Sequence, residues 1–317
     1  MKSVLSEFFS ELEVRKGHQH RLFTFLDRKI NYIMVAPAIL ILFGLVIYPF
    51  VFNINLSVHD VTLFNIRSGD WNFVGLRNFI ATFTDSFVQK TFIRTLLFAA
   101  TTVVLQLALG LVAALAFNVD FRGKSILMPM ALAPMMITPV AVGLFWRILL
   151  NSKWGIINFL LGVVDIPPVN WLANPVMAFV TIIIVQVWWG VSFVFLVILG
   201  GLSALPKEPF DSAYIDGASS FQAFRYITLP LLRPVLAVVA TIRIIDALRE
   251  FDIIYTLTGG GPGDSTRVFT LKLFMTAFER GQYSLAAAQA IILLVIIMIL
   301  TSGLIRALTR TGTTESG

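Results

Sequence analysis

The sequence predicts an all-α integral membrane protein with six transmembrane helices. Hydrophobic residues make up 57% of the 317-residue chain and charged residues only 13%, which excludes an ordinary soluble domain. Five stretches of about 20 or more residues contain no Asp, Glu, Lys or Arg, and about 20 apolar residues are what a helix needs to cross the hydrocarbon core. One further apolar stretch, at about residues 234–255, is interrupted by charged residues and gives the sixth span.

The chain opens with a mixed-charge segment, residues 1–29, whose apolar residues recur at helical spacing. This pattern predicts an amphipathic tail that lies on the membrane surface or packs on a partner subunit. The segment is too acidic for a signal peptide, so no cleaved signal is expected. The spans are then expected at about residues 32–52, 95–119, 126–146, 176–199, 234–255 and 285–305.

An apolar run at residues 155–164 is too short to cross the membrane and predicts an interfacial helix.

The chain is expected to divide into four parts. The parts are the amphipathic tail at 1–29, the first transmembrane helix with an extracytoplasmic loop at 30–94, a five-helix core at 95–306, and a short tail at 307–317.

Basic residues predict the orientation. The tail at 1–29, the residues after the last span (from 306 on), the turn at 120–125 and the loop at 206–233 together carry 13 lysines and arginines, against 9 in the loops on the other side. Because cytoplasmic segments are enriched in Lys and Arg, both termini and the 206–233 loop are expected in the cytoplasm. Basic residues near a membrane need no nucleic acid to explain them. The chain has no cysteine, and its three histidines lie outside the spans, so no metal site is expected.

The most distinctive segment is residues 206–234, PKEPFDSAYIDGASSFQAFRYITLPLLRP, which is polar but lies between two long apolar runs. It predicts a short helix from Glu208 to Asp216 that ends at Gly217 in a left-handed conformation. Ser219 or Ser220 is then expected to cap a second short helix, which Pro230 ends.

This segment closely resembles the EAA loop of ATP-binding-cassette (ABC) importer permeases. The motif's Glu-Ala-Ala positions hold Asp211, Ser212 and Ala213, its Gly is Gly217, and its Ile-x-Leu-Pro ends at Pro230. In that family the helix-turn-helix lies in a groove of a cytosolic ATPase subunit. The resemblance therefore implies ATPase-coupling residues at Asp211, Ser212, Ala213, Asp216, Gly217 and Ala218. An ordinary amphipathic linker between two spans is the alternative.

Two glycine-containing segments invite a nucleotide-binding interpretation. Gly123-Lys124-Ser125 lacks the first glycine of a Walker A loop and joins two expected membrane helices rather than a strand and a helix. The run Leu257–Pro262 also follows no strand, and Pro262 has no amide to donate. It resembles a Leu-Thr-x-Gly-Gly-Pro signature of carbohydrate-importer permeases, as Trp71–Phe79 resembles a segment after their first span.

Charged and aromatic residues inside two spans indicate where a substrate would lie. Arg243, Asp246 and Glu250 are expected on one face of the fifth span, where they either line a polar cavity or form structural salt bridges. In the fourth span, Gln186, Trp189 and Phe193 lie near the middle, where rings face either lipid or a sugar.

The chain also resembles the larger membrane subunit of the maltose importer, which holds its sugar on these same two helices. The matching positions are Gln186, Trp189, Gly190 and Phe193 on one helix and Arg243, Asp246 and Ala247 on the other. Most residue types differ there. The resemblance therefore implies the site but not the sugar.

Taken over about residues 30–306, the resemblance implies an ABC type I permease fold. It implies an importer subunit for a sugar, polyol or glycoside, in the bacterial inner membrane and without bond chemistry of its own. Its partners would be a second homologous permease, two ATPase subunits that carry ATP and Mg²⁺, and an extracytoplasmic solute-binding protein.

Two rival functions remain. An ion-coupled secondary transporter would show paired repeats with charge in corresponding spans, and only one span here carries charge. A membrane-embedded hydrolase or transferase would need a nucleophile and base, which the spans do not provide.

Overall fold

The computed structural model describes residue 32 and residues 34–310, and the chain divides into two units, Met1–Leu56 and Ser57–Gly317. The predicted amphipathic tail at 1–29 lies outside the described residues. The described part of the first unit is a helix that continues to Ser57 and includes the π-helix η1 (Phe43–Ile47) and α2 (Tyr48–Ser57). At Met34–Ser57 it is long and apolar enough to span a membrane.

The second unit begins with a short polar segment. Strand β1 (His59–Asp60) pairs antiparallel with β2 (Asn72–Phe73), and α3 (Arg77–Thr84) follows. The Ser284 hydroxyl donates to the Val61 carbonyl at 3.0 Å, which ties this segment to the start of the last helix.

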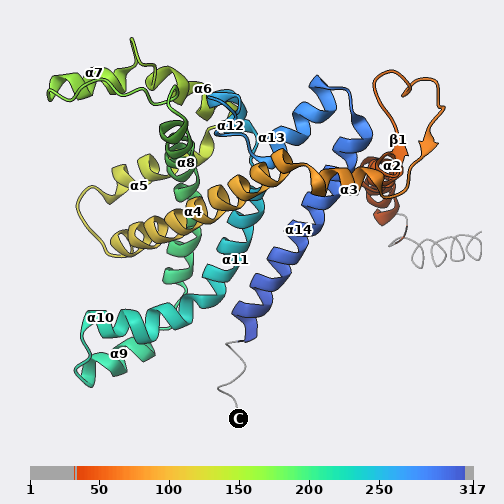
Figure 1. Cartoon of the computed structure of the whole chain (residues 1–317). Helices are drawn as coiled ribbons and strands as arrows, with labels where there is room; N and C mark the ends of the chain where they lie inside the picture. Colours follow the sequence, from red (N-terminus) through yellow and green to blue (C-terminus); the bar gives the residue numbers. More distant parts are fainter. Residues whose placement is uncertain (1–31, 33, 311–317) are drawn as a thin grey trace, which may run out of the picture. The chain divides into compact units, whose positions relative to one another are not determined.

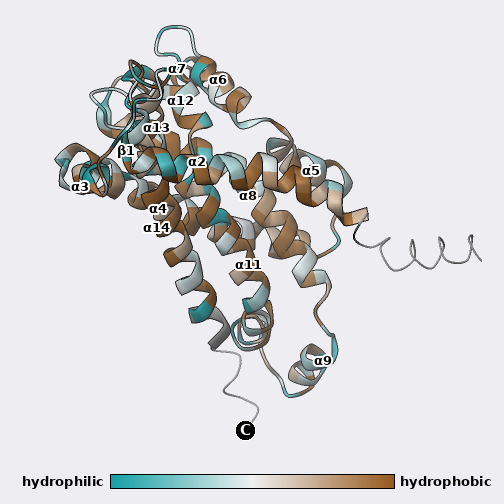
Figure 2. Cartoon of the chain, turned by 90° about the vertical axis from the view of Figure 1, so that its right-hand side faces the viewer, coloured by the Kyte–Doolittle hydropathy of each residue, from teal (hydrophilic) through white to brown (hydrophobic). Residues whose placement is uncertain are grey.

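Four long helices build the second unit (Figure 1): α4 (Ser86–Phe117), α8 (Pro175–Ser203), α11 (Leu229–Leu248) and α14 (Tyr283–Arg310). They are mostly apolar along their length (Figure 2). Helix α11 packs against the other three.

Helices α4 and α8 share the most extensive packing and approach each other through glycine. A Cβ at Gly110 would lie 2.5 Å from Val194 Cγ1. Small residues allow this close approach between membrane helices. The largest fully buried side chains around this contact include Phe98, Ile182, Phe195 and Ile198.

Shorter helices cover the two ends of the second unit. Near one end lie α6 (Pro139–Leu149), α7 (Ile156–Val163), α12 (Asp252–Thr258) and α13 (Phe269–Phe274), which leads into π-helical η4 (Met275–Glu279). At the other end lie α9 (Glu208–Ile215) and α10 (Ser220–Ala223). Both views show α9 far from α6 and α7 (Figures 1 and 2). Helix α7 confirms that residues 155–164 form a short helix.

Among the described residues, four helices are long and apolar enough to cross a membrane: Met34–Ser57, α4, α8 and the Tyr283–Arg306 part of α14. A broken helix, Lys124–Met136 with Pro139–Leu149, makes five if it crosses as one span. Helix α11 is not among them because its 20 residues include Arg233, Arg243 and Asp246. Six spans, with α11 as the sixth, fit the architecture but remain a prediction.

The third predicted span is not continuous. Helix α5 (Lys124–Leu132) passes into 3-10 helix η2 (Ala133–Met136), and α6 leaves at 104°. Prolines cause the break, because Pro134 and Pro139 have no N–H for a helical hydrogen bond and residues 137–138 are extended.

The bounds of the second and fifth predicted spans also need correction. Helix α4 begins nine residues before residue 95, where the Asp85 side chain accepts the Phe87 N–H at 2.8 Å and caps it. Helix α11 begins at Leu229, five residues before the predicted start, and ends at Leu248. The next helix, α12, is separate from it.

Candidate functional site

The segment 206–234 forms a helical hairpin. Helix α9 ends at Gly217, whose φ of +79° is left-handed. The Gly217 N–H donates to the Tyr214 carbonyl at 3.1 Å and the Ala218 N–H to the Ala213 carbonyl at 2.9 Å. This pair of bonds is the Schellman motif, which satisfies the last carbonyls of a helix. The prediction of a left-handed turn at Gly217 is confirmed.

The second helix of the hairpin begins with a capping box. The Ser219 hydroxyl accepts the Gln222 N–H at 3.3 Å, and the Gln222 side chain accepts the Ser219 N–H at 2.8 Å. Of the two serines considered, Ser219 is therefore the cap.

The prediction that Pro230 ends this second helix is wrong. Helix α10 continues through the π-helical segment η3 (Phe224–Thr228) directly into α11. Pro230 lies where η3 passes into α11, and its missing N–H accompanies a π-helical turn there rather than a helix end. The hairpin is thus joined to α11 without a loop.

The hairpin exposes large apolar side chains. Ile215 is 86% exposed, Tyr226 74% and Phe221 73%. Large apolar side chains exposed on an otherwise polar segment indicate a surface for interaction with a partner.

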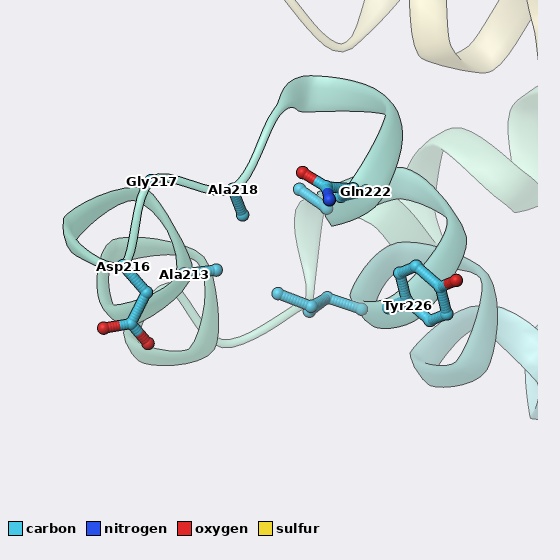
Figure 3. Close-up of a pocket in the computed structure, with 8 residues that line it drawn as sticks. Ala213, Asp216, Gly217, Ala218, Gln222 and Tyr226 are labelled. Carbon is cyan, nitrogen blue, oxygen red and sulfur yellow. The ribbon is translucent and has the colours of Figure 1, made fainter.

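Between the two helices of the hairpin lies a hollow of about 330 Å³ (Figure 3). Three alanines contribute small side chains to its lining, Ala213, Ala218 and Ala223. Polar and aromatic side chains complete it, with Gln222 and Tyr226 lying across from Ala213 (Figure 3). Among the predicted coupling residues, Ala213, Asp216, Gly217 and Ala218 line the hollow, whereas Asp211 and Ser212 are exposed on α9 outside it.

A second concave site, the polar pocket, lies among the long helices. It has a volume of about 200 Å³ and is lined by Met135, Trp189, Phe193, Ile242, Arg243 and Asp246. The pocket therefore combines η2, α8 and α11, which are far apart in sequence.

Arg243 organises the polar pocket. Its side chain is only 5% exposed and forms an ion pair with Asp246, whose side chain is 43% exposed. The guanidinium carbon lies 5.6 Å from the centre of the Trp189 ring and 5.3 Å from that of Phe193. Cation–π contact and the ion pair compensate the buried charge. The Arg243 Nε has no hydrogen-bond partner among the described residues.

The other four predicted pathway residues do not line this pocket, and three of them contact α4. The Gln186 carbonyl accepts the Gln106 side-chain N–H at 2.8 Å. A Cβ at Gly190 would lie 2.2 Å from the same Gln106 nitrogen. Ala247 is buried in a cluster with Ala99 and Val103 of α4.

Glu250 lies beyond the end of α11. Its carboxylate accepts the Ile253 N–H at 3.0 Å in the first turn of α12, and its residue is buried. The prediction that positions 243, 246 and 250 share one helical face is wrong, because the helix ends at Leu248 before it reaches Glu250.

Sequence reasoning missed Met135 and Ile242 in the pocket. Ile242 is adjacent to Arg243 in the sequence, and this adjacency could have indicated it as a pocket residue. Met135 enters only because the third span is broken, and the prolines at 134 and 139 were the signal that could have indicated it.

The two glycine-containing segments have structural contacts. Gly123 precedes α5, and Lys124 Nζ pairs with the Asp120 carboxylate at 3.1 Å. In the Leu257–Pro262 run, Gly259 ends α12 with φ +62°, and the Thr258 and Thr266 hydroxyls lie 2.7 Å apart. Among the residues that the structure describes, no cluster of His, Cys, Asp and Glu could hold a metal ion.

Comparison with known proteins gives consistent matches. Residues 106–311 match the family described as binding-protein-dependent transport system inner membrane component. The trehalose/maltose transport system permease protein MalF of Thermococcus litoralis is 37% identical over 277 residues, which cover 87% of this chain and 92% of that protein. The sulfoquinovosyl glycerol transport system permease protein SmoG of Agrobacterium fabrum is 30% identical over 286 residues, covering 88% and 90%.

A solved structure shows the same fold. A chain in the crystal structure of a bacterial alginate ABC transporter, in complex with an alginate pentasaccharide-bound periplasmic protein, matches with a TM-score of 0.79 at 20% identity. The match covers 93% of this chain and 99% of that one.

Proposed function

The chain belongs to the family of binding-protein-dependent transport system inner membrane components, and we propose that it is the permease subunit of an ATP-driven importer for a sugar, polyol or glycoside. The observation that carries this proposal is the hairpin formed by α9 and α10. A capped hairpin that exposes Ile215, Phe221 and Tyr226 and joins α11 without a loop is suited to passing motion from a docked partner to a membrane helix.

The partner on the hairpin is a cytosolic ATPase, and ATP and Mg²⁺ are bound and used there rather than on this chain. Two copies of the ATPase serve two permeases, this chain and a homologous one. A solute-binding protein delivers the substrate from the extracytoplasmic side.

The polar pocket is the part of the pathway that contacts the substrate. Trp189 and Phe193 supply flat rings for the C–H faces of a sugar, and Asp246 supplies a half-exposed carboxylate for its hydroxyl groups. The names of the relatives, for trehalose or maltose and for sulfoquinovosyl glycerol, support this substrate class.

Transport follows from two states of the complex. ATP binding draws the ATPases together, shifts the hairpins and favours a cavity open to the outside, and hydrolysis restores the inward-facing state. A ligand shifts this equilibrium only if it binds one state more tightly than the other. ATP bound to the ATPase subunits is that ligand.

Orientation is part of the proposal: both termini and the hairpin lie in the cytoplasm. Because the chain has no cysteine, single cysteines at Ser68 and Ser220 report topology cleanly; Ser220 is preferred because Ser219 is the helix cap. In intact spheroplasts, an impermeant thiol reagent should label Ser68→Cys and not Ser220→Cys. Labelling of both would contradict the orientation.

Uptake by the complete transporter in proteoliposomes tests the function. With the solute-binding protein outside and ATP inside, we expect accumulation of radiolabelled trehalose, maltose or a related glycoside, and none with a non-hydrolysable ATP analogue. Uptake that needs an ion gradient and no ATP would instead establish the ion-coupled alternative.

A further inference from the structure

The break in the third span leaves backbone carbonyls that need donors. At the corner formed by residues 133–138, the chain turns by 104°, and Pro139 has no N–H to continue the helical pattern. Unsatisfied carbonyls are costly at membrane depth, so side chains of neighbouring helices usually supply the missing donors.

Helix α8 supplies one donor to a carbonyl within this corner and one to a carbonyl just before it. The Trp189 indole N–H donates to the Ile137 carbonyl at 3.0 Å. One turn later, the Ser192 hydroxyl donates to the Ala131 carbonyl at 2.7 Å. These two hydrogen bonds hold the broken helix against α8.

The two bonds differ in what else their side chains touch. Ser192 is buried and lines a separate, largely apolar cavity with Ala131, Pro134 and Phe195. Trp189 is a wall of the polar pocket, and the Arg243 guanidinium lies over its ring. Ser192 therefore ties the end of α5 to α8 outside the polar pocket, whereas Trp189 contacts both the corner and the pocket.

Met135 gives the corner a second link to the same pocket. It belongs to η2, within the corner, and lines the polar pocket beside Trp189 and Arg243. A group that enters the pocket therefore contacts the corner both through Met135 and through the indole that is hydrogen-bonded to it.

We infer that Trp189 is a positioning residue that latches the corner at residues 133–138 to the polar pocket, so that a sugar stacked on the indole restrains the corner. The ring binds the sugar face, and the N–H sets the orientation of the ring and holds the Ile137 carbonyl. The inference rests on the proposed function, because the pocket must lie on the path of the substrate.

A spin label on the corner tests the latch. Met136 is exposed and lies beside Ile137, and because this chain has no cysteine, Met136→Cys gives it a single labelling site. The labelled chain is assembled into the full transporter complex with partner subunits whose cysteines have been replaced. Label mobility is compared in the parent, in Trp189→Phe, which keeps an aromatic ring and removes the N–H, and in Ser192→Ala, which removes the matched bond outside the pocket.

Without sugar, Trp189→Phe should raise label mobility at residue 136, because Ile137 is next to the label. Ser192→Ala should leave it close to the parent, because Ala131 lies in α5, five residues before the label. With trehalose or maltose, whichever the parent transports, the sugar should lower mobility in the parent and in Ser192→Ala but not in Trp189→Phe. Transport by Trp189→Phe should fall by about three- to tenfold, the range for one interhelical hydrogen bond, while thermal stability should fall no further than in Ser192→Ala.

Parent-like mobility in Trp189→Phe without sugar would overturn the latch, whatever the substrate is. An equal rise in Ser192→Ala would reduce Trp189 to an ordinary packing residue and overturn it as well. Failure of the parent to take up any solute with ATP would contradict the proposed function instead, and the sugar-free comparison would still decide the latch.

Discussion

The hairpin and the polar pocket are built in opposite ways. The hairpin takes its shape from consecutive residues, through the Schellman turn at Gly217 and the capping box at Ser219, and it exposes its apolar side chains. The pocket is assembled from three segments that are far apart in the sequence, and it buries its positively charged group, the Arg243 guanidinium. Substitutions in the hairpin should therefore damage coupling while the subunit stays folded. Substitutions around the pocket should change binding and stability together.

The largest effect is expected from Gly217→Val. A left-handed backbone costs an L-residue about 1–2 kcal/mol, and a β-branched side chain resists it further. Because a Cβ at this position meets nothing within 4 Å, the strain comes from the backbone alone. The subunit should insert normally but lose ATPase docking and transport, measured by co-purification and by uptake into proteoliposomes.

Gly217→Asn is the matched control, since Asn tolerates the left-handed region. It should retain most of the transport. If Val and Asn behave alike, the left-handed turn does not explain the role of Gly217.

The next largest effect is expected from Asp246→Asn, which keeps the shape of the pocket and removes the negative charge of the Asp246 carboxylate. Loss of a charge-assisted hydrogen bond to the sugar costs on the order of 1.5–3 kcal/mol, so sugar binding should weaken roughly ten- to hundredfold. Basal ATPase activity should persist, because Asp246 lies outside the hairpin.

The same change removes the ion-pair partner of the buried Arg243. If Asp246 serves mainly that structural pair, detergent melting of the purified complex should fall while sugar preference stays intact. That result would remove Asp246 from the substrate contacts.

A smaller effect is expected from Ala213→Leu, which fills the hollow between α9 and α10. If an ATPase side chain inserts there, the added atoms should weaken docking by about 1–2 kcal/mol, in the range for overpacking. Ala204→Leu adds the same atoms at an exposed position before the hairpin and serves as the control. Equal ATPase affinity for the two variants would show that the hollow is not used.

The smallest effect is expected from Gly190→Ala. The new methyl group must displace the Gln106 amide and its hydrogen bond to the Gln186 carbonyl, at a cost of about 1 kcal/mol, the lower end for overpacking. In the same helix, a Cβ at Gly200 meets nothing within 4 Å, so Gly200→Ala should melt like the parent. A lower melting temperature for both would point to the backbone of α8 rather than to its contact with α4.

The sequence alone determined the features that depend on neighbouring residues. Five uncharged runs indicated spans, because the hydrocarbon core requires about 20 apolar residues. Among the described residues, four of these runs lie in continuous helices long enough to span, and the fifth lies in the broken helix of residues 124–149. Gly217 indicated the turn of the hairpin, and Ser219 or Ser220 indicated its cap, since left-handed turns and N-caps are formed by local hydrogen bonds.

Only the tertiary structure decided which side chains meet. Prolines mark a possible break at residues 134 and 139, but only the structure shows the angle of 104° and the hydrogen bonds that Trp189 and Ser192 of α8 donate there. Gly190 has no side chain, so nothing in the sequence indicates that it packs against Gln106. Arg243 and Asp246 share a face of α11, but the helix ends at Leu248, before Glu250. The Glu250 carboxylate instead accepts the Ile253 N–H in the first turn of α12. Contacts of this kind join residues far apart in the chain, and no local pattern encodes them.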